Sequence, residues 1–285
     1  MVERAVAWSP GHISGYFRRC TGPDGAVTGS IGGGVVIAEG VKVEAVQSEF
    51  PRVRVCCRSP GGAAILAEGS PPVEYLMARL GVSADLTTTC SLPIGAGFGL
   101  SAAALLASGA ALSALFRLEL SRACIASVAH DVEVCFRTGL GDVAAEQGGG
   151  VVVRRTPGID GEILRHGNDA PLWAVSFGPI PTRGVLDSDE AMARVRTAFP
   201  GSEPHGLAPL VTVSRGFTEA SGLVTRRVRA ALAACDEASV PASMTMLGDG
   251  VFAIGEDAPV ALAPFGHVFR LAVSSRGFCL LEGDA

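Results

Sequence analysis

The stretch Leu92–Phe116, LPIGAGFGLSAAALLASGAALSALF, decides the fold. Gly95, Gly97 and Gly99 form a turn, and an unbroken run of apolar and small residues follows them. A glycine turn that opens into a helix leaves backbone N–H groups free at the positive end of the helix dipole, where anions bind. Glycine also lets the backbone approach a phosphate without a Cβ atom in the way. The stretch therefore predicts a phosphate-binding loop at the N-terminus of a buried helix.

Two alternative roles for this loop stay open from the pattern alone. A dinucleotide-binding fold needs the spacing G-x-G-x-x-G and an acidic residue about 20 positions later, at the end of a strand. Here the spacing is Gly95-x-Gly97-x-Gly99, and Glu119, at a comparable distance, lies between two predicted helices. A turn that serves packing alone would not need Ser101, whose hydroxyl in the first helical turn is well placed for a phosphate oxygen or Mg²⁺. We therefore favour a loop that holds the phosphates of ATP.

The composition excludes several other chemistries. Of the 285 residues, 48% are hydrophobic and 18% are charged, which suffices for one large or two ordinary globular domains. The net charge is -5 and no run of like charges marks a nucleic-acid surface, so no nucleic-acid partner is expected. Lys42 is the only lysine. A Walker-type Gly-Lys-Ser/Thr loop is therefore excluded, and a Schiff-base enzyme would have to use Lys42, which no motif supports.

Neither a membrane segment nor a secretory signal is predicted. The uncharged run Cys90–Phe116 is long enough to raise the question, but Pro93 and the glycines interrupt its first third and the rest is mostly Ala, Ser and Gly. The first residues, Met1–Trp8, contain Glu3 and Arg4 and no apolar core of a signal peptide. The eight cysteines include no C-x-x-C pair, which indicates a reduced, cytoplasmic protein without a zinc site.

The remaining pattern predicts an α+β chain of two domains, residues 1–160 and 161–285, with a Pro- and Gly-rich seam over 157–171. Strands are expected over 2–9, 35–46, 53–57, 85–92, 151–156, 173–177 and 267–274, with a hairpin over 242–254. Helices are expected over 71–80, 100–116, 121–137, 143–147, 188–199, 208–221 and 222–238. Loops or connections are expected over 10–17, 22–34 and 58–69.

Carboxylates in the middle of the chain form a second group of candidates. His130, Asp131 and Glu133 lie on one predicted helix, and Asp142 follows a glycine turn. Phosphoryl transfer needs a positioned Mg²⁺, neutralised charge and an oriented nucleophile, so one carboxylate for the metal and one for the hydroxyl would suffice. Taken singly, each has an ordinary structural role open to it: a solvated helix face for Asp131 or Glu133, a turn residue for Asp142, and a satisfied helix histidine for His130.

Arg154 and Arg155 follow an apolar strand and supply a third group. Adjacent strand residues face opposite ways, so one of the two can point into a site while the other meets solvent. The guanidinium fork suits a carboxylate ligand. An exposed strand end would account for both arginines equally well when they are considered alone.

Together these motifs resemble a known family, the GHMP small-molecule kinases. Pro93–Ala103 is similar to its nucleotide loop P-x-x-x-G-L-G-S-S-A-A, and Gly139–Asp142 with the following glycines to its G-x-G-x-D…GG segment. Pro10-Gly11 resembles the start of the first family motif, and Met246–Ala253 stands where the third belongs. The resemblance covers the whole chain and implies an ATP- and Mg²⁺-dependent kinase with its nucleotide site between the two domains.

The resemblance also implies residue roles. Asp142 would orient or deprotonate the acceptor hydroxyl, and Ser101 and Glu133 would coordinate Mg²⁺. Arg154 would bind a substrate carboxylate. His130, His12 and Thr28 would lie near the substrate. The loop would hold ATP through Pro93, Gly95, Gly97, Phe98, Gly99, Leu100, Ser101 and Ala102. A homodimer is a further expectation taken from the family.

Departures from the family pattern point to one branch. Leu100 replaces the first of the two motif serines, and the first motif is PGHISGYF, without the usual Arg and Asn. These features, with AHDVEV and GLGDVAAE, resemble the archaeal branch that phosphorylates pantoate on the route to coenzyme A. The alternatives are a kinase of homoserine or of a mevalonate-like alcohol, and a non-catalytic ligand sensor with the same fold. Asp142 argues against homoserine kinases, and the joint presence of Ser101, Glu133 and Asp142 argues against a sensor.

Overall fold

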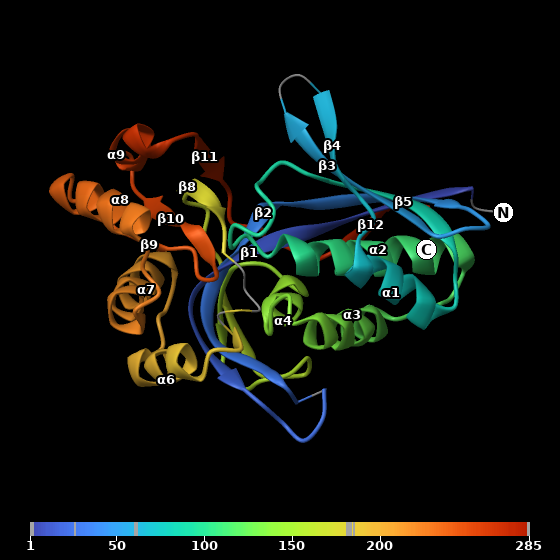
Figure 1. Ribbon diagram of the computed structural model, residues 1–285, viewed down its shortest axis with the longest axis horizontal. Coiled ribbons are helices and arrows are strands. Elements are labelled where there is room, and N and C mark those ends of the chain that lie inside the picture. Colours follow the sequence, from blue (N-terminus) through green and yellow to red (C-terminus); the bar gives the residue numbers. More distant parts are fainter. Residues whose placement is uncertain (1–2, 26, 60–61, 181–183, 185, 284–285) are drawn as a thin grey trace.

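The computed structural model describes residues 3–25, 27–59, 62–180, 184 and 186–283. The molecule has two halves, each a sheet packed with helices, and they lie side by side along its long axis (Figure 1). Within the described residues, one sheet has eight strands and the other has four. The predicted α+β class is therefore confirmed.

The large sheet has the strand order β12-β1-β2-β5-β3-β4, and β6 joins β2 and β7. Its strands are β1 (Arg4–Cys20), β2 (Gly29–Gln47), β3 (Arg52–Ser59), β4 (Gly62–Glu68), β5 (Ala84–Cys90), β6 (Val151–Arg154), β7 (Ile163–His166) and β12 (Cys279–Glu282). The hairpin of β3 and β4 extends away from the body of the molecule (Figure 1).

The first two strands correct two predicted loops. Residues 10–17 belong to β1, and residues 29–34 belong to β2. The two strands pair from Arg4 to Cys20, and their register shifts where Pro10 and Gly15 fall. Bulges tolerate proline and glycine, so the long antiparallel pairing overrides the local turn signals. The loop that remains, from residue 21 to residue 28, contains residue 26, which is outside the described residues.

Three shorter strands were also missed. The predicted connection over 58–69 contains β4, and the predicted seam over 157–171 contains β7. β12, close to the C-terminus, pairs antiparallel with β1. Both β7 and β12 lie beyond residue 160 and still belong to the large sheet. The division into residues 1–160 and 161–285 stays a prediction.

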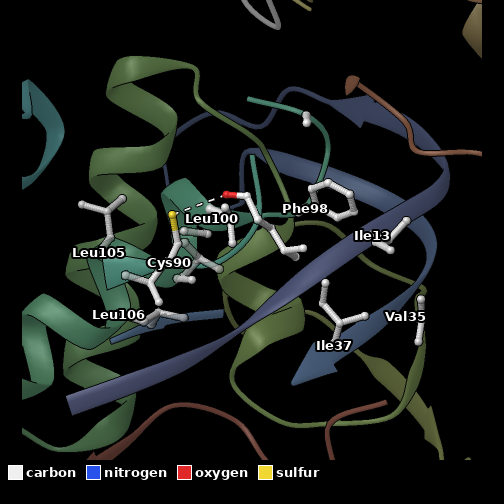
Figure 2. Packing of buried hydrophobic residues seen from close by; sticks show 14 of the residues in the cluster. Ile13, Val35, Ile37, Cys90, Phe98, Leu100, Leu105 and Leu106 are labelled. Carbon is white, nitrogen blue, oxygen red and sulfur yellow. Dashed lines mark hydrogen bonds between the residues drawn. The ribbon is translucent and has the colours of Figure 1, made fainter. Parts of the chain in front are cut away.

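Four helices cover one face of the large sheet and follow the predicted bounds closely. They are α1 (Pro71–Leu80), α2 (Leu100–Phe116), α3 (Arg122–Phe136) and α4 (Asp142–Glu146). α2 lies between the sheet and the other helices, which is why it is apolar nearly all round (Figure 1). Figure 2 shows Phe98, just before α2, facing Ile13 of β1, and Cys90 beside Leu105 and Leu106. None of the helices in the described part of the chain is long and apolar enough to cross a membrane.

The second half of the molecule combines the small sheet with the α-helices that follow β8 in the chain. The sheet has the order β11-β8-β10-β9, from β8 (Leu172–Pro179), β9 (Ala242–Met244), β10 (Gly248–Ile254) and β11 (Val268–Leu271). The helices are α6 (Asp189–Ala198), α7 (Leu207–Ser221), α8 (Arg226–Glu237) and α9 (Ala258–Leu262). The predicted hairpin over 242–254 is confirmed. α8 begins later than the predicted 222 because the Thr225 side chain caps the amide of Val228.

Candidate active site

The phosphate-binding loop has the geometry that its glycines predicted. Gly95, Gly97 and Gly99 have φ angles of 76°, 83° and 68°, in the left-handed region that other residues rarely adopt. Gly99 is the residue before α2, and no side chain caps the helix there. The first amides of α2 are therefore free to bind an anion at the positive end of its dipole.

A cavity opens in front of this loop and brings four parts of the sequence together. Its lining residues are His12, Ser14, Gly95, Gly97, Phe98, Gly99, Leu100, Ser101, Thr138, Asp142, Met246 and Leu247. The loop is held from behind by the segment before β10, where Thr245 donates a hydrogen bond to the Ala96 carbonyl at 3.2 Å. On the other side, the His12 amide donates to the Phe98 carbonyl at 2.9 Å. The first and third family motifs thus both support the central loop.

Asp142 faces this cavity from the first turn of α4. Its Oδ1 lies 2.7 Å from Nδ1 of His12 on β1. Burial is the largest influence on His12 and lowers its pKa, although the bond to Asp142 opposes the shift. The imidazole is therefore neutral near pH 7, with its proton on Nδ1 and donated to the carboxylate. The sequence predicted His12 as a substrate neighbour, and the structure places its ring against Asp142.

Arg154 lies behind Asp142 at the end of β6. Its side chain is buried, with Nη1 3.4 Å from Nε2 of His12 and Nη2 3.5 Å from the hydroxyl of Ser30. Burial lowers the pKa of Arg154, but the ordinary pKa of a guanidinium is so high that it stays charged. Arg155 points the other way and pairs with Glu162 and Glu203 at the surface. The prediction that one arginine faces inward and its neighbour meets solvent is confirmed.

Glu133 reaches the same region from α3. A Cβ atom built on Gly139 would lie 2.6 Å from Oε1 of Glu133 and 2.7 Å from Oδ2 of Asp142, so the two carboxylates converge there. A Cβ atom on Gly141 would lie 2.8 Å from Nε of Arg154. Gly139 and Gly141 thus leave room for polar and charged side chains to approach the backbone closely. Burial raises the pKa of Glu133, and Asp142 adds to the rise while His130 opposes it.

The donors available here suit Mg²⁺. Oε2 of Glu133 is buried and has no hydrogen-bond partner among the described residues. Those residues contain no cluster of three or more metal-binding His, Cys, Asp or Glu side chains. Mg²⁺ commonly takes only one or two carboxylates and completes its shell with phosphate oxygens and water. Glu133 and the exposed hydroxyl of Ser101 on the cavity wall fit that kind of site.

His130 and Thr28 lie deeper than the cavity wall. Nε2 of His130 is 2.9 Å from the Thr28 carbonyl and 3.2 Å from the Gly25 carbonyl. Its Nδ1 faces Oε2 of Glu133 at 3.8 Å. Burial alone would lower the pKa of His130, but Glu133 together with the carbonyls of Thr28 and Gly25 outweighs it, and the net shift is upward. His130 therefore ties the loop after β1 to α3, and its role toward a substrate stays a prediction.

The other predicted loop residues divide into cavity wall and core. Gly95, Gly97, Phe98, Gly99, Leu100 and Ser101 line the cavity. Ala102 is buried in α2, and Pro93 lies half-buried at the start of the loop. Ser14 and Thr138 also line the cavity, but the sequence analysis named neither as a site residue. Ser14 stands two residues after His12 in the first motif, so the motif was the signal available for it.

A second cavity continues from the loop toward the outer side of α2. Leu100 and Ser101 line both cavities. The second is walled mostly by apolar atoms, from Val41, Val55, Ser70, Pro72, Val73, Thr88, Cys90, Ile94 and Ala104. A flat, apolar ring system fits such a lining better than a charged group does.

Comparison with known proteins agrees with this geometry. Residues 70–150 match the family model of the GHMP kinases N terminal domain. A pantoate kinase of Methanospirillum hungatei JF-1 is 45% identical over 284 residues, which cover 99% of this chain and 98% of the relative. A pantoate kinase of Methanocaldococcus jannaschii is 27% identical, over 87% of this chain and 92% of the relative.

Among solved structures, a phosphotransferase related to the CoA biosynthesis pathway superposes with a TM-score of 0.77 at 22% identity. The match covers 97% of this chain and 98% of that chain. The family model and the similarity over nearly the whole chain define a small-molecule kinase with the GHMP architecture. The chain belongs to the GHMP kinase family, and within it to the pantoate kinases.

Proposed function

We propose that this protein transfers the γ-phosphoryl group of ATP to the primary hydroxyl of pantoate, giving 4-phosphopantoate for coenzyme A synthesis. The observation that carries the proposal is the cavity that holds the glycine loop and Asp142 together, in a chain 45% identical to a pantoate kinase over nearly its whole length. The loop supplies amides for phosphates, and Asp142 supplies a carboxylate for the acceptor hydroxyl.

Asp142 is the proposed general base. As the hydroxyl oxygen forms its bond to the γ-phosphorus and the bond to the β-bridging oxygen breaks, the hydroxyl proton passes to the carboxylate. His12 donates its Nδ1 proton to Oδ1, which keeps that oxygen engaged and directs Oδ2 toward the side where Glu133 lies. His12 is thus a positioning residue in this proposal, and Arg154 in turn contacts its Nε2.

The phosphates would be held by the first amides of α2 together with Ser101. A bound Mg²⁺ would neutralise charge on the transferring group, and Ser101 and Glu133 would be its protein ligands. The apolar second cavity next to Leu100 would take the adenine ring. With one lysine in the chain, charge neutralisation falls to the helix dipole, the metal and arginine.

Arg154 is the proposed partner of the substrate carboxylate. It is the buried arginine beside Asp142, and its Nε has no hydrogen-bond partner among the described residues. A buried guanidinium with an unused donor is costly unless an anion satisfies it. A hydroxy acid placed with its carboxylate there would bring its hydroxyl toward Asp142.

The cytoplasmic location and the homodimer stay predictions, and the eight free cysteines are consistent with a reducing compartment.

The test is ADP release measured over a panel of small hydroxy acids and alcohols that includes pantoate, homoserine and mevalonate. All three compounds carry a carboxylate, but homoserine would bring an ammonium group close to the buried guanidinium of Arg154, and mevalonate places its primary hydroxyl one carbon further from the carboxylate. Pantoate should therefore give a kcat/KM about a hundredfold above the others. A higher kcat/KM for homoserine or mevalonate would mean that the protein is a kinase of that compound and not of pantoate. Nucleotide binding without turnover of any acceptor would favour the non-catalytic sensor.

A further inference from the structure

Glu146, the last residue of α4, has no part in the mechanism above and yet lies directly under the phosphate loop. Its side chain is 0% exposed. Neither carboxyl oxygen has a hydrogen-bond partner within the described part of the chain. The hydroxyl of Ser9 lies close to this carboxyl group and also reaches the Pro10 carbonyl, at 3.4 Å. Burying a carboxyl group without a full set of hydrogen bonds costs free energy, so its presence here needs a specific explanation.

The contact that matters is with Gly99. A Cβ atom built on Gly99 would lie 2.5 Å from Oε1 of Glu146 and 2.8 Å from the backbone nitrogen of His12. Gly99 carries the left-handed φ of 68° that turns the loop into α2. The carboxyl group therefore fills the space beneath the last turn of the loop, beside the strand segment that bonds to the Phe98 carbonyl.

The placement of Glu146 also links this contact to Asp142. The two residues stand four positions apart on α4, so they lie on the same face of the helix, Asp142 at the cavity and Glu146 one turn further in. The far end of α4 is anchored where the Phe278 amide donates to the Glu146 carbonyl at 3.3 Å. The short helix α4 thus positions both the proposed base, Asp142, and the side chain that packs beneath the phosphate loop, Glu146.

We propose that Glu146 is a positioning residue that supports the phosphate loop from below through its carboxyl contact with Gly99, and so sets the affinity for nucleotide. The inference rests on the proposed kinase function. The direction of its pKa shift agrees with this role: burial, then the charges of Asp142 and Glu133, raise the pKa of Glu146 well above its ordinary value, while the Ser9 hydroxyl opposes the rise. An uncharged acid leaves the positive potential at the start of α2 intact for a triphosphate, whereas a carboxylate would oppose it.

The experiment compares Glu146→Leu, which keeps the volume without polar atoms, with Glu146→Gln, which keeps the shape and a neutral polar group. The affinity for ADP with Mg²⁺ is measured by calorimetry on the full chain, together with the KM values for ATP and pantoate. Glu146→Leu should weaken ADP binding and raise the KM for ATP about tenfold, because small displacements of a positioned loop are costly. The KM for pantoate should stay within about twofold, and Glu146→Gln should restore native values.

Unchanged ADP affinity in Glu146→Leu, an equal rise in both KM values, or failure of Glu146→Gln to restore binding would each overturn the inference. If Glu146→Leu does not fold, Glu146→Met, which has an unbranched side chain of similar length without the carboxyl group, takes its place and must show the same selective loss of nucleotide affinity. Native affinity in that variant overturns the inference as well. Because ADP binding needs no turnover, a native protein that binds ADP but phosphorylates no pantoate contradicts the proposed function alone.

Discussion

Nδ1 of His12 and Oδ1 of Asp142 lie 2.7 Å apart, although 130 residues separate them in the chain. The bond joins the middle of β1 to the start of α4 across the cavity that the glycine loop borders. Because the buried ring is neutral, it orients the carboxylate without neutralising it. The structure therefore presents Asp142 as an oriented carboxyl group on the cavity that the loop borders.

Replacing His12 by alanine should lower kcat about 10- to 100-fold while the KM for ATP changes little, because an oriented base would become a mobile one. Steady-state kinetics with both substrates varied measures the split. His12→Asn is the matched control, since its side-chain amide can donate to Asp142 from nearly the position of Nδ1. If the alanine and asparagine variants are equally slow, the hydrogen bond that orients Asp142 does not explain the loss of kcat.

Asp142→Asn should lower kcat about 10²- to 10⁴-fold, the range usual for loss of a general base. Asparagine is nearly isosteric and Asp142 is partly exposed, so the melting temperature should stay close to native. Binding of ADP with Mg²⁺, followed by calorimetry, should persist. A variant that retains native turnover would remove Asp142 from the chemistry and favour the sensor alternative.

Arg154→Lys should raise the KM for pantoate about tenfold or more and leave the KM for ATP nearly unchanged, because a lysine ammonium cannot reproduce the bidentate fork. The chain offers a matched control in Arg155→Lys, one residue along the same strand end. Arg155 pairs with Glu162 and Glu203 at the surface, so its substitution should change neither constant. A larger effect on the KM for ATP would place Arg154 on the nucleotide side.

Local signals were sufficient for the helices around the site. The predicted bounds of α2 agree with the structure, and α1 ends at Gly81, which adopts φ 68° as a helix-ending glycine does. Ser121 caps α3 through its side chain, at the predicted residue. These features depend on residues within a few positions of each other, which is why sequence alone can find them.

Long-range pairing accounts for what sequence reasoning missed. Pro10 and Gly15 indicate turns locally, but the pairing of β1 with β2 holds both residues in extended strands. That pairing is evident only in the complete sheet. The partnership of His12 with Asp142 and the contact of Glu146 with Gly99 depend on that same sheet. The family resemblance could name His12 and Asp142 as site residues, but nothing local showed that they bond to each other. Glu146 carried no motif at all.

Ser101→Ala should weaken Mg²⁺-dependent turnover, raising the Mg²⁺ concentration needed for half-maximal rate several-fold while the fold is kept. The exposed hydroxyl on the first turn of α2 is the expected metal or phosphate contact, and removing one neutral ligand costs about 1–2 kcal/mol. Ser108→Ala is the control on the same helix, because that hydroxyl is buried away from the cavity and has no partner among the described residues. Equal Mg²⁺ titrations for both variants would take Ser101 out of the site.

Glu146→Gln should change how stability depends on pH. The folded-state pKa of Glu146 is raised above the ordinary value of 4.5, so the folded protein holds a proton that the unfolded chain releases. The native protein should therefore lose stability relative to Glu146→Gln as pH rises above about 4.5, by up to about 1.4 kcal/mol per pH unit, until the folded-state pKa is passed. Urea unfolding at pH 5 and pH 8 measures the difference between the two proteins. A constant difference across that range would mean that Glu146 is ionised in the fold, and the loop would then rest on a charged carboxylate.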